Sequence, residues 1–520
     1  MQELRVLQSH LLVWRQFSTN QHSHVFKLQR INKLKNIEMY PYKFEYNSDI
    51  SKFRDDYKHL QQSETIQEEI KLAGMITSFR DYGKKLKFLD IERNGESIQL
   101  KISKEHFRDE IDFVRLSDIF SKGDKVGEFN FCFCQYPYLI LYFIGVTGIP
   151  TRTKSGELSL LVSQIQLLAP CLRNLPATNY EISHKRFKKR YLDFMLNQKS
   201  RDIIIARSKV IRFIRKFLED RRFLEVETPI LGVNVGGANA KPFYTWHNDM
   251  GQQLAMRIAP ELHLKQLIIG GLDRVFEIGK LFRNEGVDQT HSPEFTSVEL
   301  YQAYSDYQDL IQMTEDLLSG LTTELDLHPS HQGKPLDFSA PFNKIEFIPS
   351  LESACNQTFP PLDELGSVDS LRFLKSLCEK HSIETAGLVT APRLLDKLAG
   401  KLVEPELVEP TFLLHHPLLM SPLAKQHRSQ PGLAERFELF IGGQEVVNAY
   451  TELNDPELQR LAFQAQAGLA DPEAMLPDED FCVSLEYGLP PTAGWGAGID
   501  RLVMILTDTQ SIRNVITFPL

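Results

Sequence analysis

Short runs between Ile66 and Pro170 alternate between apolar and polar positions, and glycine and charged residues separate one run from the next. Four of these runs read IKLAGMITSF, KKLKFLDIE, ESIQLKIS and ELSLLVSQIQLLAP. A period of two is typical of β-strands that bury one face. The pattern predicts a five-stranded Greek-key barrel of the oligonucleotide-binding type over residues 66–175.

Three residues of this predicted barrel are candidates for contact with a nucleic acid. Phe88 could stack on a base, while Gln99 and Glu157 could read base edges. The alternative is that all three are ordinary core or surface residues of a barrel.

Beyond Arg201 the apolar positions recur with the period of a helix. They are Ile204, Val210, Ile211, Ile214, Phe217 and Leu218. The next segment, FLEVETPIL, predicts a strand that ends at Pro229. A helix is expected to begin near Pro260, and the strand after it runs into a polar loop at Arg283.

Polar side chains share one face of a strand predicted in PEFTSVELYQAY. Phe295, Ser297, Glu299 and Tyr301 alternate, so the strand presents them on the same side. A carboxylate without a partner is costly to bury. This face is therefore expected to meet a cation or a cavity.

A hairpin pattern nearer the C-terminus repeats this arrangement. The segment RFELFIGGQEVVNAYTELND turns at Gly442–Gly443. Asn448, Tyr450 and Glu452 alternate along its second strand and share one face.

Glu438 and Glu445 flank that turn and are candidate ligands for a hard cation such as magnesium. Strict alternation puts Glu445 and Asn448 on opposite faces, so a shared site requires a β-bulge. Farther on, AGWGAGIDRLVMIL leads from small residues into a helix with Arg501 in its first turn. Small residues there would let a phosphate chain or a neighbouring backbone come close.

Composition is that of an ordinary globular protein of two or three domains, with 520 residues, 42% hydrophobic and 24% charged. The net charge of −9 means that a nucleic acid needs a local basic surface. Residues Lys185 to Arg222 could supply it, unless they form a solvated helix face. The six cysteines include no C-x-x-C pair, which argues against zinc and disulfides and for a reducing compartment.

The first 26 residues have the pattern of a mitochondrial transit peptide. They contain Arg5 and Arg15, apolar residues at amphipathic spacing and a single acid, Glu3. The sequence Arg15-Gln16-Phe17-Ser18 resembles a processing site. We therefore expect a transit peptide over 1–26, an arm over 27–65 and a mitochondrial matrix location. The alternatives are a disordered tail and a cytoplasmic protein.

Together these segments resemble the three motifs of class II aminoacyl-tRNA synthetases, and most closely the lysyl-tRNA synthetases of subclass IIb. The resemblance rests on RYLDFMLN, GGANAKPF, MRIAPEL, FRNEG, SPEFTSVELYQAY, SPLAK, NAYTELNDP and EYGLPPTAGWGAGIDR. It runs from about Arg30 to the C-terminus. It implies an α+β protein: an anticodon-binding barrel over 66–175, then a catalytic domain over 176–520 on an antiparallel sheet flanked by helices. A helical insertion is expected at about 360–427, and a homodimer through the first motif.

The resemblance also implies an activity, which is ATP-dependent activation of lysine and its transfer to tRNA(Lys). Arg283 and Arg501 would be the catalytic residues. Lysine would be bound by Gly237, Glu261, Glu299, Tyr301, Asn448, Tyr450, Glu452 and Gly488. ATP would be bound by Arg283, Glu285, His291, Phe295, Glu438, Gly498 and Arg501, and Mg²⁺ by Glu438 and Glu445. Phe88, Gln99 and Glu157 would contact the anticodon.

The acidic end of this pocket favours lysine over aspartate and asparagine, whose enzymes share the subclass. A carboxylate would meet like charges, and an amide would leave Glu299 and Glu452 unpaired. Against ornithine, one methylene shorter, a pocket supplies only about 1 to 3 kcal/mol. Ser292 stands where the family commonly has asparagine, which shortens the reach of that side chain toward ATP.

One apolar run, EFNFCFCQYPYLILYFIGV from Glu128 to Val146, interrupts the resemblance. Its length approaches that of a membrane span, but Asn130, Gln135 and Pro137 are poor residues for one. We predict that residues 127–144 are surplus in a barrel strand, because family members join the flanking segments directly. Our hypothesis is a translated intron, and the alternative is a genuine loop or a membrane-contact hairpin. An exposed apolar segment also invites aggregation.

Two other functions fit part of the pattern. A ligase that attaches lysine to a protein would generally lack the anticodon barrel. A noncatalytic RNA-binding scaffold would not need Arg283, Glu445 and Arg501.

Overall fold

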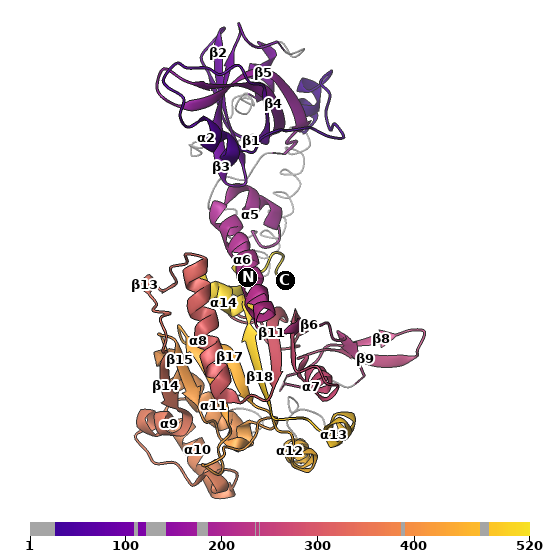
Figure 1. Ribbon diagram of the computed structural model, residues 1–520, viewed down its shortest axis with the longest axis vertical. Coiled ribbons are helices and arrows are strands. Elements are labelled where there is room, and N and C mark those ends of the chain that lie inside the picture. The colour runs from indigo at the N-terminus through magenta and orange to yellow at the C-terminus, as the bar shows by residue number, and fades with distance from the viewer. Residues whose placement is uncertain are drawn as a thin grey trace, which may run out of the picture. The chain divides into compact units, whose positions relative to one another are not determined.

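The computed structural model describes residues 27–108, 113–120, 142–173, 186–233, 236–238, 240–385, 390–468 and 478–520 (Figure 1). The chain divides into two compact units, Met1–Arg186 and Phe187–Leu520. The expected boundary at residue 176 lies in a segment outside the described residues, as does the predicted transit peptide.

The N-terminal unit contains the predicted five-stranded barrel. Its strands are β1 (Ile70–Asp81), β2 (Leu86–Arg93), β3 (Glu96–Ser103), β4 (Phe143–Arg152) and β5 (Leu158–Ala169). The same unit contains the helices α2 (Ile50–Tyr57) and α3 (Arg115–Phe120). The barrel closes in the order β1-β2-β3-β5-β4. Among the strand pairs of its described residues, β3–β5 is parallel and the others are antiparallel. Alternate residues such as Leu89, Ile91 and Leu100 are fully buried inside it. The fold prediction for this unit is confirmed.

The end of the apolar run belongs to the barrel. Ile144 is fully buried and pairs with Gly74 of β1 and Leu167 of β5. Phe143 is the first residue of β4. The last two residues of the predicted surplus segment, Phe143 and Ile144, therefore carry strand pairing in β4. Residues 127–141 lie outside the described part of the chain. None of the helices within the described ranges is both long and apolar enough to cross a membrane.

An eight-stranded sheet forms the centre of the C-terminal unit. Its order is β14 (Asn343–Glu346), β15 (Thr411–Leu414), β16 (Arg436–Ile441), β17 (Gln444–Thr451), β18 (Thr492–Gly498), β11 (Glu294–Ala303), β10 (Arg274–Phe282) and β6 (Leu224–Glu225). The central pairs are antiparallel, as expected, but the edge pairs β14–β15 and β10–β6 are parallel. The predicted antiparallel sheet is therefore mixed at its edges.

Alternation along the central strands separates the two faces of this sheet. On one face, Val298, Val447 and Trp495 join the main hydrophobic core. That core also contains residues of α6 (Gln198–Asp220), α8 (Tyr307–Glu324), α14 (Ile499–Leu506) and α15 (Ile512–Val515). In Figure 1, α8 crosses the sheet near β15 and β17. Polar residues are left to the opposite face, as the sequence pattern predicts.

Smaller elements surround the sheet. They are α5 (Arg190–Leu196), α7 (Glu261–Ile269), α12 (Pro456–Gly468), α13 (Glu479–Glu486), the two-stranded β12 (Ser330–His331) and β13 (Lys334–Pro335), and a three-stranded sheet of β7 (Leu231–Gly232), β9 (Gln252–Met256) and β8 (Tyr244–His247).

The predicted helical insertion forms a satellite core of its own. Helices α9 (Phe347–Cys355), α10 (Val368–Lys380) and α11 (Ala391–Leu402) pack together, with the short helices η1 (Leu362–Glu364), η2 (Glu404–Glu406) and η3 (Leu418–Met420) nearby. The expected range of 360–427 also includes β15, which is a strand of the main sheet. The mainly helical part therefore ends before β15.

Candidate active site

A cavity of about 470 Å³ opens on the polar face of the central sheet. Strands β10, β11, β16, β17 and β18, together with α7 and α14, contribute to its walls. The sequence-predicted residues that line it are Gly237, Glu261, Arg283, Glu285, His291, Phe295, Glu299, Tyr301, Glu438, Glu445, Asn448, Tyr450, Gly498 and Arg501. Residues more than 260 positions apart in the sequence thus meet in one site.

Strand register explains how the acidic residues come together. Strand β18 lies between β11 and β17, so Gly496 pairs with both Glu299 and Asn448. Gly494 likewise pairs with Tyr301 and Tyr450. A Cβ atom on Gly494 would collide with Oε1 of Glu452 and the ring of Tyr301. Small residues in β18 therefore make room for side chains from its neighbours, where we had expected a phosphate chain or a backbone.

Glu261 and Glu452 share a cation from the protein itself. Tyr450 donates its hydroxyl hydrogen to both oxygens of Glu261, at 2.7 and 2.8 Å. Nζ of Lys265 lies 2.6 Å from Oε1 of Glu261 and forms a second ion pair with Glu452. Glu452 lies behind Gly494 with 1% of its surface exposed. Sequence reasoning missed Lys265, although its position one helical turn after Glu261 could have indicated the pair.

Glu299 differs from these two carboxylates. It is 9% exposed and lines the cavity, and within the described residues it forms no ion pair. Burial and repulsion by Glu261 raise the pKa of Glu299 to about 8, although Arg283 attracts the charged form. A cation that entered this end of the cavity would favour the ionised carboxylate.

Cationic and aromatic side chains occupy the other part of the cavity. The guanidinium of Arg283 lies 5.2 Å from the ring centre of Phe295. Among the described residues, its buried Nε atom has no hydrogen-bond partner. Arg501 lies beside His291, with Nη2 and Nε2 3.0 Å apart. This arrangement suits an anionic ligand with an aromatic base, because guanidinium groups bind phosphate and Phe295 offers a ring face.

The predicted β-bulge is present in β17: Leu439 pairs with Val447 and Phe440 pairs with Glu445, which leaves Val446 as the extra residue. It lets Glu438 and Glu445 both face the cavity, where Nδ2 of Asn448 lies 3.2 Å from one carboxylate and 3.4 Å from the other. The bulge prediction is therefore confirmed.

Charges around these carboxylates push their pKa values apart. Burial opposes the charge on Glu438, but His416 and Arg436 outweigh it and lower the pKa of Glu438 to about 2. Burial and repulsion by Glu438 raise the pKa of Glu445. Nη2 of Arg436 donates to Glu438 at 2.6 Å. Sequence reasoning missed Arg436, although it alternates with Glu438 in RFELF.

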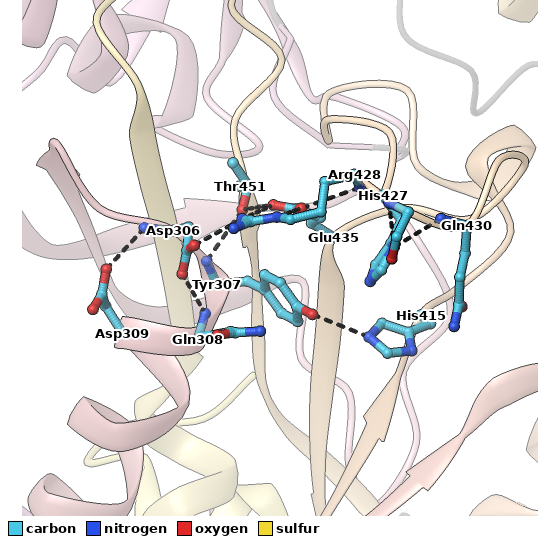
Figure 2. Close-up of polar contacts among 11 residues, drawn as sticks. Asp306, Tyr307, Gln308, Asp309, His415, His427, Arg428, Gln430, Glu435 and Thr451 are labelled. Carbon is cyan, nitrogen blue, oxygen red and sulfur yellow. Dashed lines mark hydrogen bonds and ion pairs between the residues drawn. The ribbon is translucent and has the colours of Figure 1, made fainter.

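A polar network anchors one wall of the cavity. Residues 421–424 line that wall, and Ala424 forms a β-bridge with Glu452. Figure 2 shows Arg428, just beyond this segment, between Asp306 and Glu435. Its guanidinium lies 2.7 Å from Asp306 at the start of α8 and 2.5 Å from Glu435.

The same network continues into the sheet and toward two histidines. Thr451 donates to Glu435 at 2.7 Å. The hydroxyl of Tyr307 lies 3.2 Å from Nε2 of His415, and the rings of His415 and His427 are 4.7 Å apart (Figure 2). The cavity wall is thereby tied to both α8 and β17.

Two predicted lysine-binding residues do not line the cavity: Glu452 lies behind Gly494, and Gly488 lies elsewhere. Gly488 is exposed just after α13 and does not line the cavity. Its φ of 102° and the hydrogen bond from its N–H to Leu485 indicate a helix-terminating turn, which favours glycine. The correction is that Gly494 and Gly496 form the pocket wall.

The predicted anticodon contacts lie close together on the barrel. Phe88 is half-buried on β2 and packs at 5.6 Å against Tyr82. Gln99 on β3 pairs with Asp90, two residues from Phe88, and accepts a hydrogen bond from Ser159 at 3.0 Å. Glu157 is exposed just before β5.

Comparisons with known proteins agree with this geometry. The family model described as tRNA synthetases class II (D, K and N) matches residues 183–520. Lysine–tRNA ligase cla4 of Cladosporium cladosporioides is 45% identical over 507 residues, covering 94% of this chain and 83% of that protein. A probable cytoplasmic lysine–tRNA ligase of Encephalitozoon cuniculi is 41% identical, over 95% of this chain and 96% of that protein. The lysine–tRNA ligase of Thermotoga maritima is 41% identical, over 95% of each.

The match therefore spans both the barrel and the catalytic unit, and the chain belongs to the class II aminoacyl-tRNA synthetases, in the lysine–tRNA ligase family.

Proposed function

We propose that this chain activates L-lysine with ATP and transfers the lysyl group to the 3′ end of tRNA(Lys). The observation that carries the proposal is the charge distribution of a single cavity. Glu299 and Glu261 lie in one part of it, and Arg283 and Arg501 lie in another. A substrate with an ammonium tip could therefore meet a nucleotide phosphate within one site.

The first step forms a bond between a lysine carboxylate oxygen and the α-phosphorus of ATP, while the bond to pyrophosphate breaks. No proton has to be removed, so catalysis depends on orientation and charge stabilisation. Arg283 would hold the α-phosphate and the lysine carboxylate. Arg501 and His291 would hold the γ-phosphate.

Recognition of adenine would involve two residues near Arg283. Phe295 would stack on the base opposite Arg501, and Glu285 would lie near the adenine edge. Gly498 would allow close approach of the nucleotide, because a Cβ atom there would meet its nearest neighbour only at 3.9 Å.

Glu438 and Glu445 would hold magnesium. Their carboxylates face the cavity together, and burial with repulsion between them favours a divalent cation. Within the described residues, no group of three or more His, Cys, Asp or Glu side chains is arranged to hold a metal. Phosphate oxygens and water would complete the coordination. When bound, the ion would neutralise phosphate charge.

The lysine substrate would be held at both ends. Gly237 and Glu261 would receive its α-ammonium group, and Asn448 would lie near its carboxylate. Glu299, Tyr301 and Glu452 would meet the ε-ammonium group. This arrangement favours lysine over aspartate and asparagine, the other substrates of the matched family.

Transfer to tRNA would use the barrel for recognition. We propose that Phe88, Gln99 and Glu157 contact the anticodon, because they lie near one another on the barrel. Alanine variants of the three should raise the KM for tRNA without changing the KM for lysine in pyrophosphate exchange.

We also propose that the chain forms a homodimer through α6 and β6. Ile205 and Leu224 on these elements are 48% and 51% exposed, so they would offer apolar surface that a second copy could cover. Sedimentation of the purified chain tests this.

A mitochondrial location is proposed from the arginine-containing, amphipathic residues 1–26. Fusion of this segment to a fluorescent protein tests it, and a cytoplasmic signal would overturn it.

The decisive experiment has two stages. Lysine-dependent exchange of pyrophosphate into ATP by the purified chain tests activation, and charging of tRNA(Lys) tests transfer. Exchange without charging would favour a ligase that acts on another acceptor. Absence of exchange would favour a noncatalytic scaffold.

A further inference from the structure

Lys265 is a buried cation that the proposed reaction does not itself use. It lies on α7, one turn after Glu261, and none of its surface is exposed. Its Nζ atom is 2.6 Å from Glu261 and also forms an ion pair with Glu452. The rings of Tyr450 and Phe481 lie 5.8 and 5.7 Å from Nζ. The ammonium group is thus enclosed by two acids and two aromatic rings.

The two carboxylates keep Lys265 charged. Burial disfavours the ammonium form, but attraction to Glu261 and Glu452 outweighs burial and raises the pKa of Lys265. Burial and repulsion by Glu261 raise the pKa of Glu452, and the ammonium group of Lys265 opposes that rise. With substrate bound and all three carboxylates ionised, Glu261, Glu299 and Glu452 carry three negative charges, and Lys265 carries one positive charge. The difference, 3 − 1 = 2, equals the number of ammonium groups on free lysine.

Lys265 also orients Glu452. It pairs with Oε2, while Oε1 lies against Gly494, which lines the cavity. Within the described part of the chain, neither buried oxygen of Glu452 has a hydrogen-bond partner, but Oε2 is ion-paired with Lys265 whereas Oε1 is not. The ion pair therefore leaves Oε1 beside Gly494 of the cavity wall, although Glu452 is not itself among the residues that line the cavity. Tyr450 acts similarly on Glu261 by donating to its carboxylate.

We propose that Lys265 is a positioning residue for lysine selection, which fixes Glu452 and sets the charge of the pocket to match two substrate ammonium groups. This inference rests on the proposed function. It explains why an acidic pocket contains a lysine of its own: three unpaired buried carboxylates would repel one another and take up protons.

The test replaces Lys265 with methionine, which has a similar length and no charge. Without Lys265, Glu452 should no longer be held in place for its charged hydrogen bond to the substrate. The KM for lysine in pyrophosphate exchange should therefore rise about 10- to 100-fold. The KM for ATP should change by less than about threefold, because the arginines remain. Without Lys265, a carboxylate should be protonated in the free enzyme. Calorimetry in buffers of different ionisation enthalpy should therefore detect about one additional proton released per lysine bound.

Two further variants separate positioning from folding. The double variant Lys265→Met with Glu452→Gln makes both partners of the Lys265–Glu452 ion pair neutral, while Glu261 keeps its hydrogen bond from Tyr450. This protein should fold even where Lys265→Met alone does not. In the Glu452→Gln background, Lys265→Met should raise the KM for lysine by a smaller factor than in the unmodified chain, because the part of its effect that passes through Glu452 is already lost and only the part that passes through Glu261 remains. Lys87→Met is the matched control, since Lys87 is a buried lysine paired with Asp81 in the barrel.

The outcomes distinguish this inference from the proposed function. No lysine-dependent exchange by the unmodified chain would overturn the proposed function. Normal exchange with an unchanged KM and proton count in Lys265→Met would overturn only the inference. Additive effects of Lys265→Met and Glu452→Gln would also overturn it, because they would show that Lys265 does not act through Glu452.

Discussion

The guanidinium of Arg501 donates a 2.9 Å hydrogen bond to the backbone oxygen of Glu445. This contact joins the first turn of α14 to the beginning of β17. It places the proposed phosphate ligand beside a proposed magnesium ligand. The two cations that would neutralise the phosphates of ATP, the Arg501 guanidinium and the magnesium ion, would then be held by neighbouring elements. Strand β17 would link this part of the site to the lysine-binding residues Asn448 and Tyr450.

Arg501→Ala should weaken nucleotide binding. Loss of a charged hydrogen bond to phosphate is expected to raise the KM for ATP about 10- to 100-fold, with a smaller change in the KM for lysine. Steady-state pyrophosphate exchange measures both constants. Arg372→Ala is a suitable control, because Arg372 is exposed on α10. Equal effects of the two variants would contradict the assigned role.

Binding of lysine should depend on pH through Glu299. Its pKa of about 8 means that the free carboxyl is mostly protonated below that pH and ionised above it. The ε-ammonium group needs the ionised form, so the KM for lysine should fall as pH rises through about 8. Measuring the KM for lysine in pyrophosphate exchange from about pH 6.5 to about pH 9 would show this decrease.

Glu299→Gln should remove this step from the profile and raise the KM at every pH. A profile with the same midpoint in Glu299→Gln would assign the titration to another group.

Gly494→Ala should impair lysine binding because the added methyl group would collide with Glu452 and Tyr301. We expect the KM for lysine to rise at least about tenfold. Gly366→Ala provides a control, because nothing lies within 4 Å of the added methyl group. A crystal structure of the Gly494→Ala variant should show Glu452 displaced. Normal kinetics in that variant would contradict the crowded arrangement.

Arg428→Met should destabilise the catalytic unit. Glu435 is 2% exposed and would lose its ion pair, while Arg428 is more than half exposed. Because solvent screens that guanidinium, we expect a loss of about 1 to 2 kcal/mol in the free energy of unfolding. Urea unfolding measures it. Adding Glu435→Gln should recover part of the loss, and failure to do so would indicate that the ion pair contributes little.

Deletion of residues 127–144 should improve solubility and tRNA charging. Phe143 is 43% exposed and Ile144 is fully buried in β4. Joining Val126 to Gly145 would put Lys125 at the exposed position of Phe143 and Val126 at the buried position of Ile144. Soluble yield and charging by the two forms would be compared. Unchanged values would contradict the prediction, and retention of these codons in every mature transcript would contradict the intron hypothesis.

The sequence by itself determined the strand faces and the chemistry of the site. Alternation placed Glu299 and Tyr301 on one face, and the three-residue spacing of Glu445 and Asn448 required a bulge, because side-chain direction in a strand follows a local period. Helical and strand periods also separated the barrel from the catalytic unit. Such patterns depend on neighbours along the chain, so they can be read before folding.

Only the tertiary structure decided which distant faces meet. It placed β18 between β11 and β17, so Gly494 and Gly496 form the pocket wall in place of Gly488. It also paired Lys265 with Glu452, which lies 187 residues farther along the chain (452 − 265 = 187). Strand order and the burial of an ion pair depend on packing between remote segments, and no local period records them.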